Sequence, residues 1–255
     1  MNSIHISLKA EEIFHIGAFP VTNALLLSTI SFLILSALAF FGRRKLALIP
    51  GKIQNLAEFA IEELLSLMDG VLGERRKSER YLPLVATIFI FILFSNWLGL
   101  LPGIGSIVLR PPIGGASGHE TTPLLRSPAS DLNFTLALAL ITVFGVNLLG
   151  AIAIGFISHM KKFLDFRNPI TFFIGILEFI SELAKIISFS FRLFGNVFAG
   201  EILLTIIAFL VPYVVPLPFL FLEIFVGFIQ AFVFAMLSLV FVAMATAEHD
   251  VQGSH

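Results

Sequence analysis

Five long apolar runs restrict what this sequence can fold into. A helix rises ~1.5 Å per residue, so roughly 20 apolar residues are needed to cross a bilayer core of ~30 Å. The runs at residues 21–41, 81–101, 132–158, 170–211 and 217–247 are all long enough. Charged residues make up 13% of the 255 residues, about half the share found in soluble domains. The sequence therefore predicts an all-α integral membrane protein with about five membrane helices, organised as one membrane domain over residues 1–255.

The last two runs are longer than a membrane span requires. At ~1.5 Å per residue, they would form helices of about 60 Å and 45 Å. Pro169 precedes the first of them, as proline often does at helix starts, and three prolines interrupt the connection 211–218, "VPYVVPLP". We expect residues 170–247 to form a hairpin of two long helices, strongly tilted because excess length is absorbed by tilt or kinking.

Two further segments complete the expected organisation. The N-terminal tail 1–20 lacks the basic start and short apolar core of a cleavable signal, so we expect the run 21–41 to remain as a membrane span. In residues 50–80, apolar side chains recur at helical spacing with acidic side chains between them. This pattern predicts an amphipathic helix, lying on the cytoplasmic membrane surface or against a partner, or else an ordinary packing helix.

The distribution of Lys and Arg predicts the orientation. Eight of these residues lie within 42–80, and three more, Lys161, Lys162 and Arg167, follow the third run, whereas the loop 102–131 holds two. Because cytoplasmic loops carry the excess of basic residues, the first two of these regions are expected in the cytoplasm. Five crossings then place the N-terminus outside the cell and the tail 248–255 in the cytoplasm of a multi-pass cell (inner) membrane protein.

Ionisable side chains are concentrated in the last two runs. The first three runs contain no Asp, Glu, Lys or Arg, whereas the last two contain Glu178, Glu182, Lys185, Arg192, Glu201 and Glu223. Each costs ~2.5–3.5 kcal/mol at the centre of a membrane helix, so such residues mark polar paths. We expect a polar, hydrated path between these two helices. The alternative for the first three residues is a structural ion pair, Glu178–Lys185 or Glu182–Lys185, because their spacing suits helical pairing.

Arg192 has no acidic residue three or four positions away, so its own helix offers no ion-pair partner. On a helical wheel its face also carries Ser188, Gly195 and Ala199. Small residues let another helix approach closely in a membrane. The face therefore indicates either a partner helix that brings a carboxylate to Arg192 or close packing within this chain.

The predicted antiparallel hairpin also indicates which residues of its two helices lie at the same depth in the membrane. In an antiparallel pair, residues at equal depth have a nearly constant sum of residue numbers. This places Gln230 level with Arg192, and Glu223 level with Glu201. Two acids at the same depth suit a proton relay.

Several stretches resemble one known family. The segment "SFSFRLFGNVFAGE" (188–201), followed by "QAFVFAMLSLVF" from residue 230, closely resembles subunit a of the F-type ATP synthase. The same family is matched by "SNWLGLLPG" (95–103), "SPASDLNFTLALAL" (127–140) and "IGILEFISELAKIISFSFRLFGN" (174–196). The resemblance covers nearly the whole chain, and its RLFGN-type core is a specific motif.

The resemblance implies a non-catalytic membrane stator beside a rotating ring of c subunits, to and from which protons pass through two offset half-channels. Arg192 matches the family's essential arginine between the half-channels, and Glu201 matches the glutamate of the outer one. The remaining matches are Asn196 and Gln230 near the arginine, Glu178 in the cytoplasmic half-channel, Asp131 near the outer inlet, and Glu223, where some members carry histidine and others glutamate.

The implied partners are the c-subunit ring, b-type peripheral stalk subunits and membrane lipid, within a large hetero-oligomer. A self-contained ion-coupled transporter is the alternative, and it would predict an inverted repeat and helices broken at mid-membrane. The sequence has no Cys and no nucleotide-binding or hydrolase motif, so neither a cofactor, a metal, nucleic-acid binding nor catalysis by this chain is expected. The coupling ion, proton or sodium, stays open.

Overall fold

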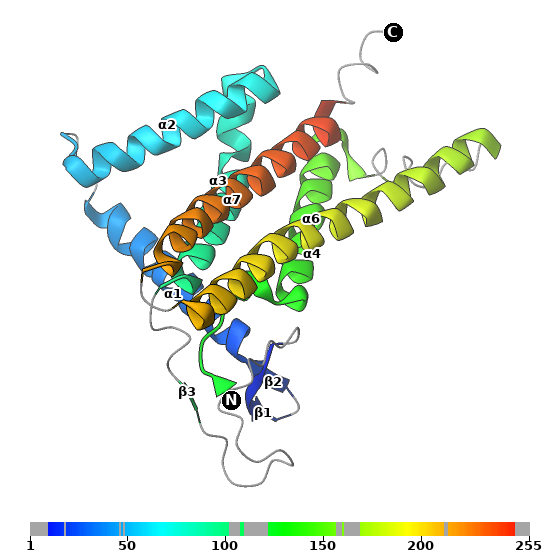
Figure 1. Cartoon of the computed structure of the whole chain (residues 1–255). Coiled ribbons are helices and arrows are strands. Elements are labelled where there is room, and N and C mark those ends of the chain that lie inside the picture. Colours follow the sequence, from blue (N-terminus) through cyan, green and yellow to red (C-terminus); the bar gives the residue numbers. More distant parts are fainter. Residues whose placement is uncertain are drawn as a thin grey trace. The chain divides into compact units, whose positions relative to one another are not determined.

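The computed structural model describes residues 10–17, 19–45, 47, 49–101, 108–109, 122–156, 160, 169–211 and 214–247. Within these ranges six α-helices make up most of the chain (Figure 1). Five of them are long and apolar enough to cross a membrane. The prediction of an all-α integral membrane protein is therefore confirmed. The predictions for Lys161, Lys162, Arg167 and the tail 248–255 lie outside the described residues.

The five long helices lie where the apolar runs predict them. Their bounds are α1 Asn23–Gly42, α3 Arg75–Gly99, α4 Leu132–Ile154, α6 Pro169–Leu210 and α7 Pro216–Ala247. Helix α3 begins well before residue 81, because its first turns are the charged sequence "RRKSER", which continues the helix. Helix α4 ends before residue 158 at Gly155, whose φ of 94° favours glycine.

Prolines set the limits of the two longest helices. Pro169 begins α6, where its missing N–H costs no hydrogen bond. The helix ends at Leu210, shortly before Pro212, because a proline disfavours helical geometry in the residue before it. Pro216 then begins α7. With 42 and 32 residues, α6 and α7 measure about 63 Å and 48 Å, well beyond a bilayer core of ~30 Å.

Two short antiparallel hairpins were not predicted by the sequence patterns. Strands β1 (Glu12–Ile16) and β2 (Phe19–Thr22) pair across a turn at Gly17. Strands β3 (Val108–Leu109) and β4 (Thr122–Pro123) form the other pair. The first hairpin leads directly into α1, whose N-terminus is capped by the Thr22 hydroxyl accepting from the Leu25 N–H at 3.3 Å. Part of the expected tail 1–20 is thus an ordered lead into the first span.

The chain divides into two compact units, and helices α3, α4, α6 and α7 contribute a segment to each. The first unit comprises Met1–Arg44, Ile90–Thr135 and Phe191–Phe232. In it, the start of α1 is joined to β4 through the buried Asn23, whose side-chain amide donates to the Pro123 carbonyl at 3.3 Å. This unit contains most of the ionisable residues that the sequence analysis selected.

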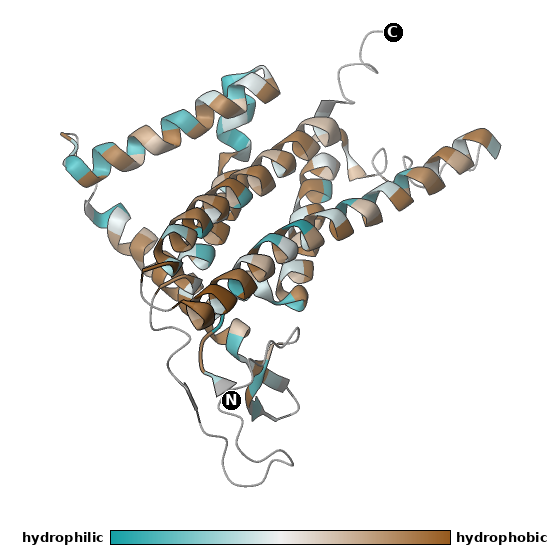
Figure 2. Ribbon diagram, in the orientation of Figure 1, coloured by the Kyte–Doolittle hydropathy of each residue, from teal (hydrophilic) through white to brown (hydrophobic). Residues whose placement is uncertain are grey.

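The second unit comprises Lys45–Phe89, Leu136–Ser190 and Val233–His255. Its apolar core draws on α2 (Lys52–Leu72), α3, α4 and α7, through Met68, Tyr81, Val85, Val146, Ala235, Leu239 and Val242. Figure 2 shows hydrophilic and hydrophobic residues interspersed along α2, in contrast to the almost uniformly hydrophobic α7. Helix α2 is the predicted amphipathic helix, and it ends at Gly73, whose φ of 72° suits glycine.

A charged corner joins α2 to α3 in the same unit. The Arg75 guanidinium donates to the carboxylates of Glu62 at 2.7 Å, Asp69 at 3.1 Å and Glu79 at 3.4 Å. We call these four residues the α2–α3 corner. The predicted amphipathic segment 50–80 therefore belongs to two helices. Gly73 ends α2, and the contacts of Arg75 hold the first turn of α3 against the end of α2.

Candidate functional site

Polar side chains connect α6 and α7 within the first unit. The Asn196 side-chain amide on α6 donates to the Gln230 side-chain oxygen on α7 at 2.6 Å. Gln230 is buried, so this bond satisfies an acceptor that would otherwise be costly to remove from water. Residue sums placed Gln230 level with Arg192, and the bond joins it to Asn196, about one helical turn further along α6.

Gly200 and Glu223 make a second contact between these helices. A Cβ atom at Gly200 would collide with the carboxylate of Glu223, so this carboxylate rests directly against the α6 backbone. Glu223 is itself buried. Glycine at position 200 leaves room for this carboxylate; the backbone angle there is ordinary.

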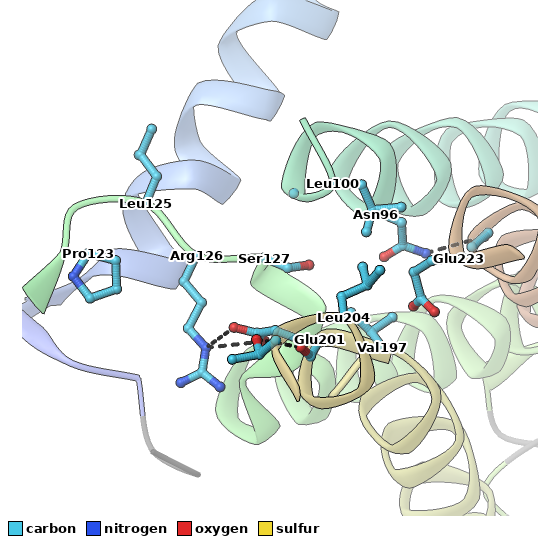
Figure 3. Close-up of a pocket in the computed structure, with 13 residues that line it drawn as sticks. Asn96, Leu100, Pro123, Leu125, Arg126, Ser127, Val197, Glu201, Leu204 and Glu223 are labelled. Carbon is cyan, nitrogen blue, oxygen red and sulfur yellow. Dashed lines mark hydrogen bonds and ion pairs between the residues drawn. The ribbon is translucent and has the colours of Figure 1, made fainter. Parts of the chain in front are cut away.

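The carboxylates of Glu201 and Glu223 border one partly open cavity of about 270 Å³ (Figure 3). Its wall combines the end of α3, the segment 123–127, α6 and α7 of the first unit. The polar lining residues are Asn96, Arg126, Ser127, Glu201, Thr205 and Glu223. A cavity with this many donors and acceptors can hold several waters and pass protons among them.

Arg126 forms an ion pair with Glu201 across this cavity (Figure 3). Its Nε atom lies 3.2 Å from Glu201 Oε1 and 3.4 Å from Oε2. The Arg126 side chain is 8% exposed and that of Glu201 38% exposed. A buried guanidinium thus meets a partly open carboxylate, which places a permanent cation in the cavity wall.

Helix α3 is fastened to α7 at the same end of the unit. The Asn96 side-chain amide donates to the Gly227 carbonyl at 3.3 Å, and the Trp97 indole N–H donates to the Ile224 carbonyl at 3.1 Å. Two buried atoms, Asn96 Oδ1 and Gln230 Nε2, find no hydrogen-bond partner among the described residues. Buried polar atoms require partners, so both atoms favour a hydrated interior.

Arg192 lies on a side of α6 that the described part of the chain leaves exposed. Arg192, Gly195, Asn196 and Ala199 are exposed, whereas Leu193, Val197 and Gly200 are buried. A Cβ atom at Gly195 would meet nothing within 4 Å. The small residue at 195 is therefore not explained by packing in this chain.

Two of the selected acids lie apart from the cavity lining. Asp131 is buried at the start of α4, where its Oδ1 accepts from the Asn133 N–H at 3.0 Å. This contact is that of an N-cap residue. Glu178, partly exposed on α6, belongs to the second unit.

Lys185 and Glu182 form an ion pair in the second unit, with Nζ 2.6 Å from Oε1. The other carboxylate oxygen, Oε2, accepts from the Asn147 side-chain amide on α4 at 3.1 Å. Lys185 also lies 4.8 Å from the centre of the Phe241 ring. The structural alternative, a helical Glu182–Lys185 pair, is confirmed, and Asn147 extends it to a second helix.

Sequence reasoning missed three participants, Asn96, Arg126 and Gly200. Arg126 was counted only as one of the two basic residues in the loop 102–131. Its place five positions before Asp131, near the start of a span, was the available signal. Asn96 lay inside the quoted motif "SNWLGLLPG" without a function. Nothing in the pattern around Gly200 indicated its contact, because the neighbour comes from another helix. Within the described part of the chain, no cluster of three or more His, Asp or Glu side chains could hold a metal ion.

Together the fold and the cavity define a multi-pass α-helical membrane protein with ionisable side chains lining a cavity in its first unit. Comparison with known proteins gives the family. The model of the family described as "ATP synthase A chain" matches residues 25–243. The chain belongs to the ATP synthase subunit a family.

Individual relatives match over most of their length. ATP synthase subunit a of Moorella thermoacetica is 33% identical over 236 residues, covering 92% of this chain and 96% of the relative. The protein of the same name from Gloeobacter violaceus is 35% identical, with 93% and 89% covered. That of Campylobacter jejuni is 36% identical, with 86% and 87% covered.

Proposed function

We propose that this chain is the non-catalytic, proton-translocating stator subunit of an F-type ATP synthase. It provides two offset half-channels to and from the carboxyl groups of a rotating c-ring, and so couples proton flow to rotation. One observation carries the proposal: α6 presents a cavity with two carboxylates on one side and Arg192 on its exposed side. Family membership supports it.

The cavity is the proposed outer half-channel. Glu201 and Glu223 relay protons through it, and Asn196 and Gln230 carry the polar path onward toward the face of Arg192. Glutamate at 223 makes this relay one between two carboxylates rather than between a carboxylate and an imidazole. Asp131 is proposed near the inlet, and its capping contact supports a role in fixing the start of α4 there as well.

Arg192 is the proposed barrier between the two half-channels. A ring carboxylate ~4 Å from its guanidinium is attracted by about 4 kcal/mol at an effective dielectric constant of ~20. This favours release of the proton that the ring carboxyl carries, and the fixed cation keeps protons from passing directly between the half-channels. Gly195 and Ala199, both small and exposed, allow a ring helix to approach closely. Glu178 lines the proposed cytoplasmic exit.

The proposed setting is a cell inner membrane, with the N-terminus outside and the C-terminus in the cytoplasm. Besides the c-ring, the partners are b-type stalk subunits and lipid. The alternative, a self-contained ion-coupled transporter, calls for helices broken at mid-membrane. Helices α6 and α7 each run continuously for 42 and 32 residues, which favours the stator.

The test is proton pumping by the assembled complex in inverted membrane vesicles. Arg192→Ala is expected to abolish ATP-driven acidification while the complex still assembles. Arg44→Ala is the control, because Arg44 is also an exposed arginine but lies just after the end of α1, over the Phe40 ring. Pumping by the Arg192→Ala complex at the level of the control would overturn the proposed function.

A further inference from the structure

Arg126 is a buried cation in the cavity wall, and the proposed proton path assigns it no role. Its side chain is 8% exposed. A buried charge is costly unless it is paired, and a guanidinium cannot escape that cost by losing its proton. The Glu201 carboxylate supplies a negative charge beside this guanidinium, and the contact restrains the carboxylate in turn.

The segment that carries Arg126 is itself held in place. Ser130 and Asp131 donate their backbone N–H groups to the carbonyls of Ser127 and Pro128, both at 3.1 Å. Ser127 lies so close to Gly99 that a Cβ atom there would be 2.7 Å from the Ser127 Cβ. Backbone position 127 is thus fixed against the end of α3, which leaves Arg126 little freedom to move away from the cavity.

The guanidinium of Arg126 also lies near an aromatic ring of α6. Its central carbon lies 5.9 Å from the centre of the Phe198 ring, one helical turn before Glu201 on α6. Cation and ring attract each other at this range. Arg126 therefore contacts two residues of α6, the Phe198 ring and the Glu201 carboxylate; Figure 3 shows the contact with Glu201.

The contact with Glu201 is made by one nitrogen. Nε reaches both carboxylate oxygens, at 3.2 Å and 3.4 Å. This is a shared, single-donor contact rather than two parallel hydrogen bonds, which would be stronger. A contact of this kind orients the carboxylate while leaving its oxygens able to exchange partners with water or with an arriving proton.

We propose that Arg126 is a positioning residue that holds the Glu201 carboxylate in the wall of the outer cavity, which contains Glu223 as well. It donates no proton of its own; protons bind to and leave the oxygens of Glu201. The inference rests on the proposed function, since it assigns Arg126 a task within the proposed outer half-channel.

Variants of both partners test this in assembled complexes in membrane vesicles, with proton flux divided by the amount of complex present. Arg126→Met keeps an unbranched apolar side chain in place of the arginine stem but removes the guanidinium donor. It is expected to lower flux roughly 10- to 100-fold, because a shift of ~1 Å in a reacting group can cost about 100-fold. Arg126→Lys keeps a cationic donor and is expected to restore part of the flux. Arg126→Gln replaces the Met variant if that variant does not assemble.

The double variant separates positioning from packing. Glu201→Gln alone should lower flux, and adding Arg126→Met should lower it little further, because the group to be positioned is already gone. Fully multiplicative losses would overturn the inference, as would a Lys variant no better than Met or an Arg126→Met complex with wild-type flux. Wild-type flux in Glu201→Gln would instead count against the proposed outer half-channel itself.

Discussion

Two glycines on α6, Gly195 and Gly200, are small for opposite reasons. At Gly200 the space of a side chain is filled by the Glu223 carboxylate of the same chain. At Gly195 that space is open, and the surrounding face is exposed. Helix α6 thus has an internal side, at Gly200, that packs against Glu223. It also has an external side, at Gly195, that the described residues leave open. The comparison teaches that a small residue is informative only when its neighbours are known.

Of the two sides of α6, the open side is expected to give the larger effect, when it is filled by Gly195→Leu. Leucine favours helix over glycine by about 0.8–1 kcal/mol, and a Cβ there meets nothing within 4 Å, so the subunit's own thermal stability should not fall. Proton pumping by the assembled complex should nevertheless fall about tenfold, because the side chain occupies the space proposed for a ring helix. Gly195→Ala is the graded control. Unchanged pumping in the Gly195→Leu variant would contradict the proposal that a ring helix packs against this side of α6.

A smaller effect is expected on the internal side from Gly200→Ala. The new methyl group must displace the Glu223 carboxylate, which can move because it ends a flexible side chain. Flux should drop roughly three- to tenfold through misplacement of that carboxylate, with little loss of stability. Adding Glu223→Asp shortens the acid by one methylene and should recover part of the flux. The internal side would lose its proposed role if the single variant pumped normally.

The smallest effect is expected at the α2–α3 corner, which serves as a reference away from both sides of α6. The Ser78 hydroxyl lowers the pKa of the Asp69 carboxyl most, burial opposes this, and the Arg75 guanidinium lowers it further. A lowered folded-state pKa adds stability above the ordinary Asp pKa, and that stability is lost as the pH falls through the folded value. Residues 66–78 should therefore be better protected from amide exchange than in the Asp69→Asn variant at neutral pH, and this difference should begin to fall near pH 3.8 and disappear as the pH falls further, through the lowered pKa of Asp69. A pH-independent difference would contradict this.

The sequence determined the helices and the antiparallel pairing of the last two. Length and hydropathy predicted α1, α3, α4, α6 and α7, because a chain in lipid must satisfy its backbone hydrogen bonds within each helix. Constant residue sums predicted an antiparallel pair with Gln230 level with Arg192, and the structure bonds Gln230 to Asn196, about one helical turn away from Arg192. The pairing of Lys185 with Glu182 could also be predicted from the sequence, because residues three positions apart on a helix are neighbours in space.

Only the tertiary structure decided which side chains share the cavity. Arg126 meets Glu201 across 75 positions of sequence, and Asn96 meets Gly227 across 131. Periodicity is a local property and carries no information about such contacts, which depend on how helices pack. The same limit applies to Gly195 and Gly200: both are glycines in one apolar helix, and the sequence cannot distinguish a space filled by Glu223 from one left open.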